Sequence, residues 1–477
     1  MEYIAGESRE QMVLFPEKLD DLIGAENPVR FIDAYIDKLD LRALNFKMRE
    51  SNIGRPAYPE KVLLKIYIYG YINRIRSSRR LENECKKNIE LMWLVGRLAP
   101  DFKTIADFRK DNKEGIKRVN KEFLKLCHKL GLLSFEIVGI DGTKIRAQNS
   151  NDSVYKRGEL EKSGRQIDNK IEEYLLELDK NDISEKGEND SLKRNIEKKL
   201  AGLKSKKEKI KKIKEIFEGN PDIKRYFLND PDCEFMKDKG CIRPGYNVQA
   251  AIDEKNKLIV AIDVVNDSND CHQLINMSDK IEETKKEIEF ARDINTVKIA
   301  DAGYYSEQGI MDAEDKGHNT YVANPLDESE KKGRKKGENI PAAGYGVEDF
   351  KYDKEKDVYI CPEGKELFRV GKKARLKNGK AVLGYACKSC KLCDKRSMCT
   401  KNKRGRRIDI YTRKEEIDEY KKKIRSKEGK KLIRRRKAIC EHPFGTIKRS
   451  LGYNYFLLKG KKGVLTEFSL ILSLIHI

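Results

Sequence analysis

The sequence predicts an α/β protein that begins with an all-helical part. Over residues 1–134 apolar residues recur at helical spacing, whereas from residue 135 short apolar strands alternate with an amphipathic helix. Strands and helices mixed in this way form an α/β layer. Two charged stretches, 156–224 and 326–410, interrupt the pattern and are predicted to be insertions in that layer.

Composition points to a polyanionic partner. The chain has 477 residues, 38% of them charged, and a formal charge of +22, which favours nucleic acid. No apolar run approaches the ~18 residues of a membrane span. The acidic start, Met1–Glu10, is not a signal peptide, and the phosphate-binding pattern GxxxxGK[ST] is absent. The chain has eleven cysteines and no export signal, which predicts reduced thiols. A cluster of cysteines is therefore interpreted first as a metal site and only then as a set of disulfides.

The N-terminal helices are predicted from apolar residues at helical spacing and from residues that favour the start of a helix. Helices are expected over 28–41, over 59–75 after Pro59, after Ser77-Ser78, and after a capping box at Thr104–Asp107. The helix over 59–75 is apolar nearly all round and should be buried. Two interpretations remain open for this block: a DNA reader that uses basic residues such as Arg79 and Arg80, or a packing and dimerisation domain.

The strands of the α/β layer are predicted from apolar runs. Phe135–Asp141 and Val297–Asp301 each form an apolar run that ends in an aspartate. Gly245–Asp253 and Leu258–Val265 are predicted to form a hairpin, and Thr320–Asn324 a further strand. A helical stripe from Leu274 to Ile288 lies between them.

The two insertions have different characters. Residues 156–224 carry two apolar stripes around a polar breaker at Asn181–Gly187, which predicts an antiparallel helical hairpin. This hairpin is either a solvated arm or a clamp on DNA or on a second protomer. Residues 326–410 begin with a predicted mobile loop at Lys331–Gly337 and end in a cysteine cluster.

Two aspartates and a glutamate could form a metal site. Asp141 and Asp301 each follow an apolar strand and, on neighbouring strands, would lie a few ångströms apart. Divalent metal relieves the repulsion between such carboxylates, and hard oxygen ligands suggest Mg²⁺ or Mn²⁺. Glu441 is the best third candidate, and Lys448, seven residues on, would share its helix face and hold phosphate. Pro443 is expected to kink this helix or mark its restart.

The cysteine cluster is a second candidate site. It consists of Cys387, Cys390, Cys393 and Cys399, with Cys361 upstream. Four thiolates can bind Zn²⁺ tetrahedrally, and the CxxC spacing suits structural zinc. Free thiols and an iron–sulfur or redox role are the alternatives.

Basic residues are concentrated before Glu441. Residues 395–437 contain 20 Lys or Arg and 6 Asp or Glu. We interpret this segment, which includes Arg434, Arg435, Arg436 and Lys437, as a surface that follows DNA phosphates in a salt-dependent way.

An ordered set of motifs resembles the DDE transposases of bacterial insertion sequences. The set comprises Gly54–Pro59, Asp101–Arg109, Asp141–Lys144, Gly245–Gln249, Ala300–Tyr305, Glu441–Lys448 and Gly452–Gly460. The resemblance implies an RNase H-like core in which Asp141, Asp301 and Glu441 hold two Mg²⁺ or Mn²⁺ ions. It also implies a bacterial cytoplasmic, nucleoid-associated protein of the cut-and-paste branch.

The resemblance departs from one pattern. Hairpin-forming relatives have Tyr, two spacers, Arg, three spacers, Glu, six spacers and Lys. Here Arg434 stands at the tyrosine position and Lys437 at the arginine position. The loss of the tyrosine weakens the case for a DNA hairpin intermediate more than it weakens the case for strand cleavage.

The sequence thus predicts a transposase that cleaves and transfers DNA strands. A helical domain over 1–134 would bind element ends, and a catalytic core would consist of 135–155, 225–325 and 411–477. Partners would be double-stranded DNA with terminal inverted repeats, target DNA and a second protomer, with no membrane. The alternatives are an inactive or C-terminally truncated transposase-derived DNA-binding protein, an RNase H-like nuclease, and a zinc-dependent scaffold.

Overall fold

A computed structural model describes most of the chain. The described residues are 18–48, 56–183, 190–238, 240–290, 292, 294–325, 345–377, 380–400, 402 and 404–472. The first two residues of the Gly54–Pro59 motif, the Lys331–Gly337 loop and the last five residues lie outside them. No helix in the described ranges combines the length and the apolar character that crossing a membrane requires.

The N-terminal part is helical, as predicted. Its helices are α1 (Pro28–Asp37), α2 (Glu60–Ile72), α3 (Ser78–Lys87), α4 (Ile89–Leu94), α5 (Phe102–Asp111) and α6 (Lys113–Lys129). Helix α2 is buried from Leu63 to Tyr71, which confirms its central place. The predicted capping box at Thr104 is wrong: α5 begins earlier, because the Asp101 carboxylate accepts N–H bonds from Lys103 and Thr104, each at 3.0 Å.

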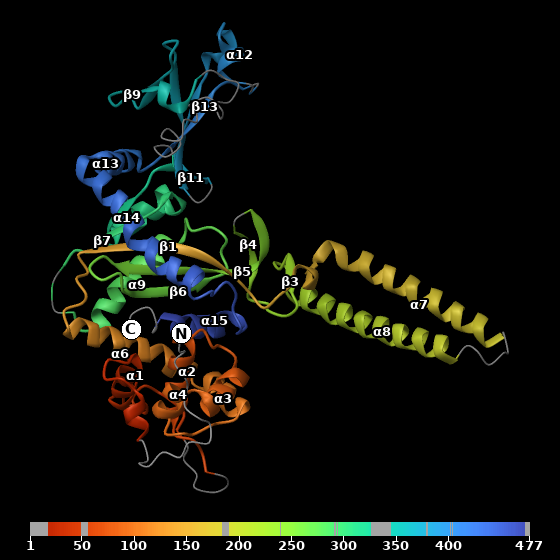
Figure 1. Ribbon diagram of the computed structural model, residues 1–477. Helices are drawn as coiled ribbons and strands as arrows, with labels where there is room; N and C mark the ends of the chain where they lie inside the picture. The colour runs from red at the N-terminus through yellow and green to blue at the C-terminus, as the bar shows by residue number, and fades with distance from the viewer. Residues whose placement is uncertain are drawn as a thin grey trace, which may run out of the picture.

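A mixed six-stranded sheet forms the centre of the molecule (Figure 1). Its strands are β1 (Ile137–Arg146), β4 (Glu234–Asp238), β5 (Cys241–Asp253), β6 (Ile259–Val265), β7 (Val297–Ala300) and β8 (Asn319–Val322). Strands β4 and β6 both pair with β5, and the order continues β5-β1-β7-β8. Strand β1 is antiparallel to β5 and parallel to β7, and β7 is parallel to β8. The predicted hairpin of β5 and β6 is confirmed.

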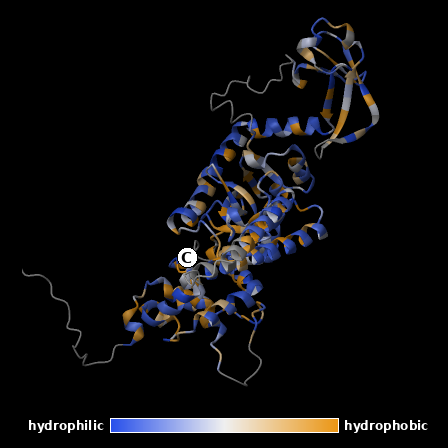
Figure 2. Cartoon of the chain, turned by 90° about the vertical axis from the view of Figure 1, so that its right-hand side faces the viewer, coloured by the Kyte–Doolittle hydropathy of each residue, from blue (hydrophilic) through white to orange (hydrophobic). Residues whose placement is uncertain are grey.

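Helices from distant parts of the sequence cover this sheet. Helix α9 (Gln273–Glu287) packs on β5 and β6, and α10 (Glu307–Asp315) packs on β8. Helix α13 (Lys414–Arg425) leads into α14 (Lys427–Gly445), which packs on β1, β7 and β8. Helix α15 (Gly460–Leu472) packs against β6 on one side and against α6 and α2 on the other. Apolar residues (orange in Figure 2) lie on the central strands, and polar residues (blue) lie along the helices around them.

The hairpin predicted over 156–224 projects from the body (Figure 1). Strands β2 (Val154–Lys156) and β3 (Arg225–Phe227) form a short ribbon at its base. Helices α7 (Leu160–Ile183) and α8 (Asp190–Gly219) form the arm, with a small core around Leu160, Ile210, Ile213 and Phe217.

The cysteine-rich segment forms a second sheet at the opposite end of the molecule from the N-terminal helices (Figure 1). The antiparallel strands, in the order β13-β12-β11-β10-β9, are β9 (Lys351–Asp353), β10 (Val358–Ile360), β11 (Glu366–Lys377), β12 (Lys380–Cys387) and β13 (Arg407–Tyr411). This sheet has a hydrophobic cluster of its own, separate from the main core.

Candidate active site

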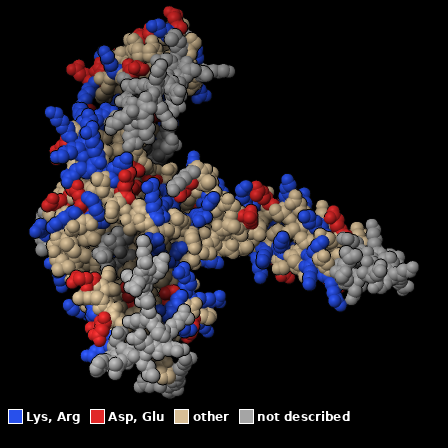
Figure 3. Space-filling model, viewed as in Figure 1, with Lys and Arg blue, Asp and Glu red and all other residues tan. Residues whose placement is uncertain are grey.

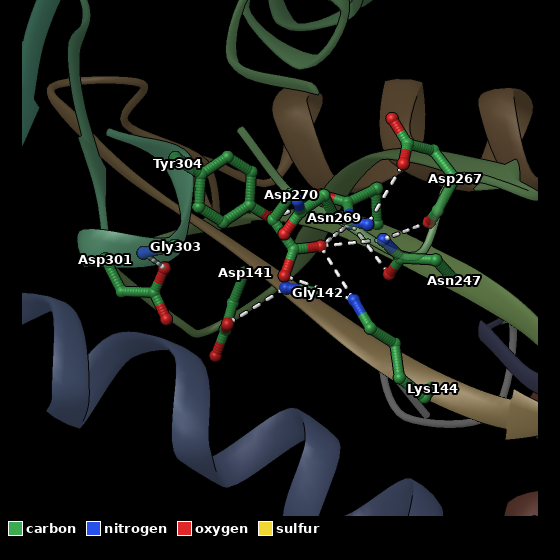
Figure 4. Close-up of polar contacts among 11 residues, drawn as sticks. Asp141, Gly142, Lys144, Asn247, Asp267, Asn269, Asp270, Asp301, Gly303 and Tyr304 are labelled. Carbon is green, nitrogen blue, oxygen red and sulfur yellow. Dashed lines mark hydrogen bonds and ion pairs between the residues drawn. The ribbon is translucent and has the colours of Figure 1, made fainter. Parts of the chain in front are cut away.

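Asp141 and Asp301 lie on adjacent parallel strands. Ile140 pairs with Ala300 at the last position where β1 and β7 are in register, so the two aspartates come next on each chain. Adjacent strands are about 5 Å apart, which brings the carboxylates side by side (Figure 4). The Asp141 Oδ1 accepts the Gly142 N–H at 2.9 Å, and the Asp301 Oδ1 accepts the Gly303 N–H at 2.9 Å.

The structure corrects one detail of this prediction. Asp141 does not end its strand, because β1 continues to Arg146 in antiparallel pairing with β5. Only the parallel pairing with β7 stops before it. Asp301 does follow the end of β7, where it occupies the N-cap position of a short 3₁₀ helix, Ala302–Tyr304.

Charge and burial act strongly on Asp141. Burial raises the pKa of Asp141 to about 6, Arg436 opposes this shift, and the charge of Asp301 adds to it. The Arg436 Nη1 lies 3.2 Å from the Asp141 Oδ2. Two carboxylates share this site, and the guanidinium of α14 offsets part of their repulsion.

Sequence reasoning missed a third carboxylate, that of Asp270, which comes just before α9. Its Oδ1 accepts hydrogen bonds from Lys144 at 2.9 Å, Asn247 at 2.7 Å and Gln249 at 2.8 Å (Figure 4). It also contributes to the raised pKa of Asp141. Lys144, Asn247 and Gln249 lie within the motifs Asp141–Lys144 and Gly245–Gln249, so the partners carried a sequence signal that Asp270 itself lacked.

Glycine at position 142 makes this network possible. A Cβ there would lie 2.5 Å from the Gln249 Nε2 and 2.8 Å from the Asp270 Oδ1. Nearby, the buried Tyr304 hydroxyl donates to the Gln249 Oε1, and burial raises the pKa of Tyr304 well above its usual range. Gln249 is therefore fixed from both ends of its amide.

Helix α14 approaches the aspartates closely, again because of a glycine. A Cβ on Gly139 would lie 2.6 Å from the Cys440 Sγ and 2.9 Å from the Ile439 Cγ2. Cys440 is fully buried against β1, and burial raises the pKa of its thiol, which therefore remains protonated. Arg436, one helical turn earlier, faces Asp141.

Glu441 occupies a different side of α14. Its side chain is 64% exposed and lies 3.8 Å from the Lys437 Nζ. Within the described ranges no three His, Cys, Asp or Glu side chains form a group that could hold a metal ion. The structure thus brings Asp141 and Asp301 together, and Glu441 lies on the helix that covers them without joining the pair.

Lys448 follows a change of helix type. Helix α14 continues through Pro443 to Gly445 and then becomes a π-helix over Thr446–Ser450. A π turn alters the register of the helix faces, so the seven-residue spacing from Glu441 no longer implies a shared face. The Lys448 side chain is 19% exposed, and its Nζ lies 3.8 Å from the Asp238 Oδ2 on β4.

The remaining basic candidates lie on two surfaces. On α14, Arg434 and Lys437 are exposed, and Arg435 pairs with Glu254 at 2.6 Å. In the N-terminal helices, Arg80 is exposed and the Arg79 guanidinium lies over the Phe102 ring at 4.8 Å. Lys and Arg gather over α13 and α14 in Figure 3.

The comparisons with known proteins concern the two ends of the chain. Residues 17–111 match a family described as a transposase domain (DUF772), and residues 360–475 match a transposase DDE domain. No curated protein and no solved structure matches the chain. The first match spans helices α1 to α5, and the second contains Glu441. Both matches are to transposase domains, in agreement with the DDE transposases of insertion sequences that the motifs of this chain resemble.

Proposed function

We propose that this transposase binds the ends of its element and performs metal-dependent strand cleavage and strand transfer at Asp141, Asp301 and Glu441. The observation that carries the proposal is the pairing of Asp141 with Asp301 on adjacent parallel strands, directly beneath the helix that bears Glu441. The parallel strands β1, β7 and β8 beside the antiparallel β5 and β6 support an RNase H-like core, with 156–224 and 326–410 as its insertions.

The residues of the site fit divalent metal. Two adjacent carboxylates, one with its pKa raised by burial and by the other's charge, carry negative charge that a cation would neutralise. All donors are hard oxygens, which suit Mg²⁺ or Mn²⁺. Bound ions would activate the attacking oxygen and stabilise the leaving oxygen of an in-line phosphoryl displacement.

The protein's own residues would position the DNA and the carboxylates. Glu441 is on the helix that covers the pair but on another side of it, so its carboxylate would join the aspartates only if α14 itself turned or shifted on the sheet. Arg436, which pairs with Asp141, could also contact a phosphate next to the reacting one. Asp270, held by Lys144, Asn247 and Gln249, would support the backbone at Gly142 behind the site.

DNA would follow the basic surface of α13 and α14. Lys422, Lys427, Lys430, Lys431 and Arg434 are exposed along it. The N-terminal helices, with Arg79 and Arg80, would read the element ends. Because two ends must be cut and joined together, a homodimer would hold them.

The test is cleavage of a DNA fragment that carries the flanks of the gene, in Mg²⁺ or Mn²⁺. The native protein should nick one defined boundary, whereas Glu441→Gln and Asp301→Asn should lose orders of magnitude in rate and still bind. Glu428→Gln, an exposed change at the start of the same helix, is the matched control and should cleave normally. Near-normal cleavage by Glu441→Gln would refute the assignment.

A second candidate is a transposase-derived protein that binds DNA without cutting it. One observation favours it: Glu441 faces Lys437 and solvent, while Arg436 occupies the side of α14 that faces Asp141. Tight, salt-sensitive binding with no nick under either metal would establish this alternative.

A further inference from the structure

The cysteine-rich sheet has a small core that four cysteines, Cys361, Cys387, Cys390 and Cys399, help to form. Its buried cluster contains Phe350, Tyr359, Leu367, Tyr385, Cys387, Cys390, Ile408 and Ile410. A domain with so few apolar side chains usually needs a disulfide or a metal for independent stability. All the cysteines in the structure are free thiols.

The cysteines surround one cavity of atomic size. Cys361, Cys387, Cys390, Cys393 and Cys399 all line a cavity of about 20 Å³ between the sheet and α12 (Arg396–Cys399). A space of this size holds about one water-sized particle. It therefore suits a single ion better than a polynuclear cluster.

Backbone N–H groups already point at two of the sulfurs. The Lys365 N–H donates to the Cys361 Sγ at 3.2 Å, across a tight turn in which Gly364 has φ +72°. The Arg406 N–H donates to the Cys390 Sγ at 3.3 Å, next to Gly405 with φ +100°. A hydrogen bond from a backbone N–H group stabilises negative charge on a sulfur atom. Donors of this kind commonly surround the ligands of a metal ion.

Positive side chains surround the same cavity. Lys365, Lys395, Arg396 and Arg406 line it together with the thiols, and the lining also includes Glu363, which pairs with Lys395 at 3.0 Å. The Arg406 guanidinium donates to the Cys399 carbonyl at 3.1 Å and to the Tyr345 carbonyl at 3.0 Å, which fixes it beside the sulfurs. Four thiolates around Zn²⁺ carry a net charge of about −2, which these cations would offset.

We propose that Cys361, Cys390, Cys393 and Cys399 bind one structural Zn²⁺ ion and that Cys387 is not a ligand. Cys361, Cys390, Cys393 and Cys399 line the cavity together, and Cys393 and Cys399 come from the segment that covers the sheet there. Cys387 ends β12, pairs with Leu367 across the sheet and is 4% exposed within the apolar cluster. The described residues include no group of side chains already at metal-binding spacing, so the four sulfurs would have to move closer together as the ion binds. The four thiols would release their protons in the same step.

The test is the metal content of the full-length protein after purification in zinc-containing medium. The native chain should hold one zinc per chain, and Cys→Ser substitution at 361, 390, 393 or 399 should abolish it. Cys387→Ser and Cys271→Ser, the matched controls, should retain it. No zinc in the native chain, iron in its place, or zinc lost from Cys387→Ser and kept in Cys393→Ser would each overturn the proposal.

A second measurement does not depend on the folding of any variant. X-ray absorption at the zinc edge of the native protein should give four sulfur neighbours at about 2.3 Å. Nitrogen or oxygen neighbours would overturn the four-cysteine assignment. Neither measurement depends on DNA cleavage, so the zinc site and the proposed catalytic site can fail separately.

Discussion

At the residue scale, single polar side chains depend on partners that lie far away in the sequence. Asp141 is paired with Arg436, and Asp270 is bonded to Lys144, Asn247 and Gln249. The sequence could predict Asp141 and Asp301, because each follows an apolar run. It could not predict Asp270, whose role depends on β5 and β1 meeting beneath the loop that leads into α9.

A buried histidine should make stability depend on pH. The His318 Nε2 lies 2.8 Å from the Asp279 Oδ1, and its Nδ1 lies 3.1 Å from the ammonium group of Lys298. Burial lowers the pKa of His318; the bond to Asp279 opposes this shift and the charge of Lys298 adds to it. The unfolded chain therefore takes up the proton more readily than the folded protein does.

The free energy of unfolding should accordingly decrease as the pH falls. The contribution of His318 is present above its ordinary pKa of about 6.5 and is lost as the pH falls below it. Urea denaturation at about pH 7.5 and about pH 5 should show a smaller pH dependence for His318→Gln than for the native protein. An identical pH dependence in the two proteins would rule out this role.

At the element scale, the contact of α14 with β1 controls the site. Gly139→Ala should reduce the free energy of unfolding by about 1–3 kcal/mol, because the new methyl group overlaps Cys440 and Ile439. It should also slow cleavage, since α14 carries Arg436 and Glu441. Denaturant titration and the cleavage assay measure the two effects.

A double variant provides the control for this contact. Cys440→Ala removes the sulfur that the new methyl group would meet at 2.6 Å. Gly139→Ala combined with Cys440→Ala should therefore be more stable than the sum of the two single changes predicts. Strict additivity would show that α14 does not press on β1 at this point.

Element boundaries show where sequence patterns stop being informative. The strand with Asp141 was predicted to end there, but pairing with β5 extends it to Arg146. The start of α5 depends on which carboxylate reaches the free N–H groups, and Asp101 does so ahead of Thr104. The π-helix after Gly445 also departs from the regular spacing on which the Glu441–Lys448 face was predicted. The extension of β1 depends on tertiary pairing, whereas the α5 cap and the π-helix are local features that the spacing of apolar residues does not encode.

The projecting arm has one basic helix and one acidic helix. Helix α8 contains 11 basic and 5 acidic residues, whereas α7 contains 4 basic and 7 acidic. Lys198, Lys209 and Lys212 are exposed and recur at helical spacing on one face of α8. This pattern favours the DNA clamp over the solvated arm.

Removing these charges should weaken DNA binding. The triple change of Lys198, Lys209 and Lys212 to Gln should reduce the slope of log affinity against log salt by up to about 3. The matched control changes Lys162, Arg165 and Lys170 of α7 to Gln, which removes the same charge from the acidic helix. Equal effects of the two triple variants would show that only the net charge matters and would exclude a specific role for α8.

At the scale of the whole molecule, the N-terminal helices and the central sheet share one hydrophobic core. The Tyr453 hydroxyl donates to the Tyr71 carbonyl at 2.6 Å, and Arg76 lies over the rings of Tyr453 and Tyr455. The sequence predicted a boundary after residue 134, because the spacing of apolar residues changes there from helical to strand-like. It could not show that residues near position 453 pack against α2, because that contact spans 382 residues.

A single tryptophan can test whether these parts unfold together. Trp93 is the only tryptophan in the chain and lies in α4, far from α14 in the sequence. If the core is continuous, Gly139→Ala in the sheet should lower the denaturation midpoint that Trp93 fluorescence reports. An unchanged Trp93 midpoint, with a lowered midpoint by circular dichroism, would show that the N-terminal helices unfold independently.

The proposed strand cleavage depends on metal coordination by the paired aspartates. Thiolate is a softer ligand than carboxylate and binds Mg²⁺ poorly, whereas Mn²⁺ tolerates it better. The most direct measurement is therefore cleavage of end DNA by Asp301→Cys in each metal. We expect Asp301→Cys to lose cleavage in Mg²⁺ and to regain part of it in Mn²⁺. Cleavage in Mg²⁺ at the native rate would contradict the claim that Asp301 holds the metal.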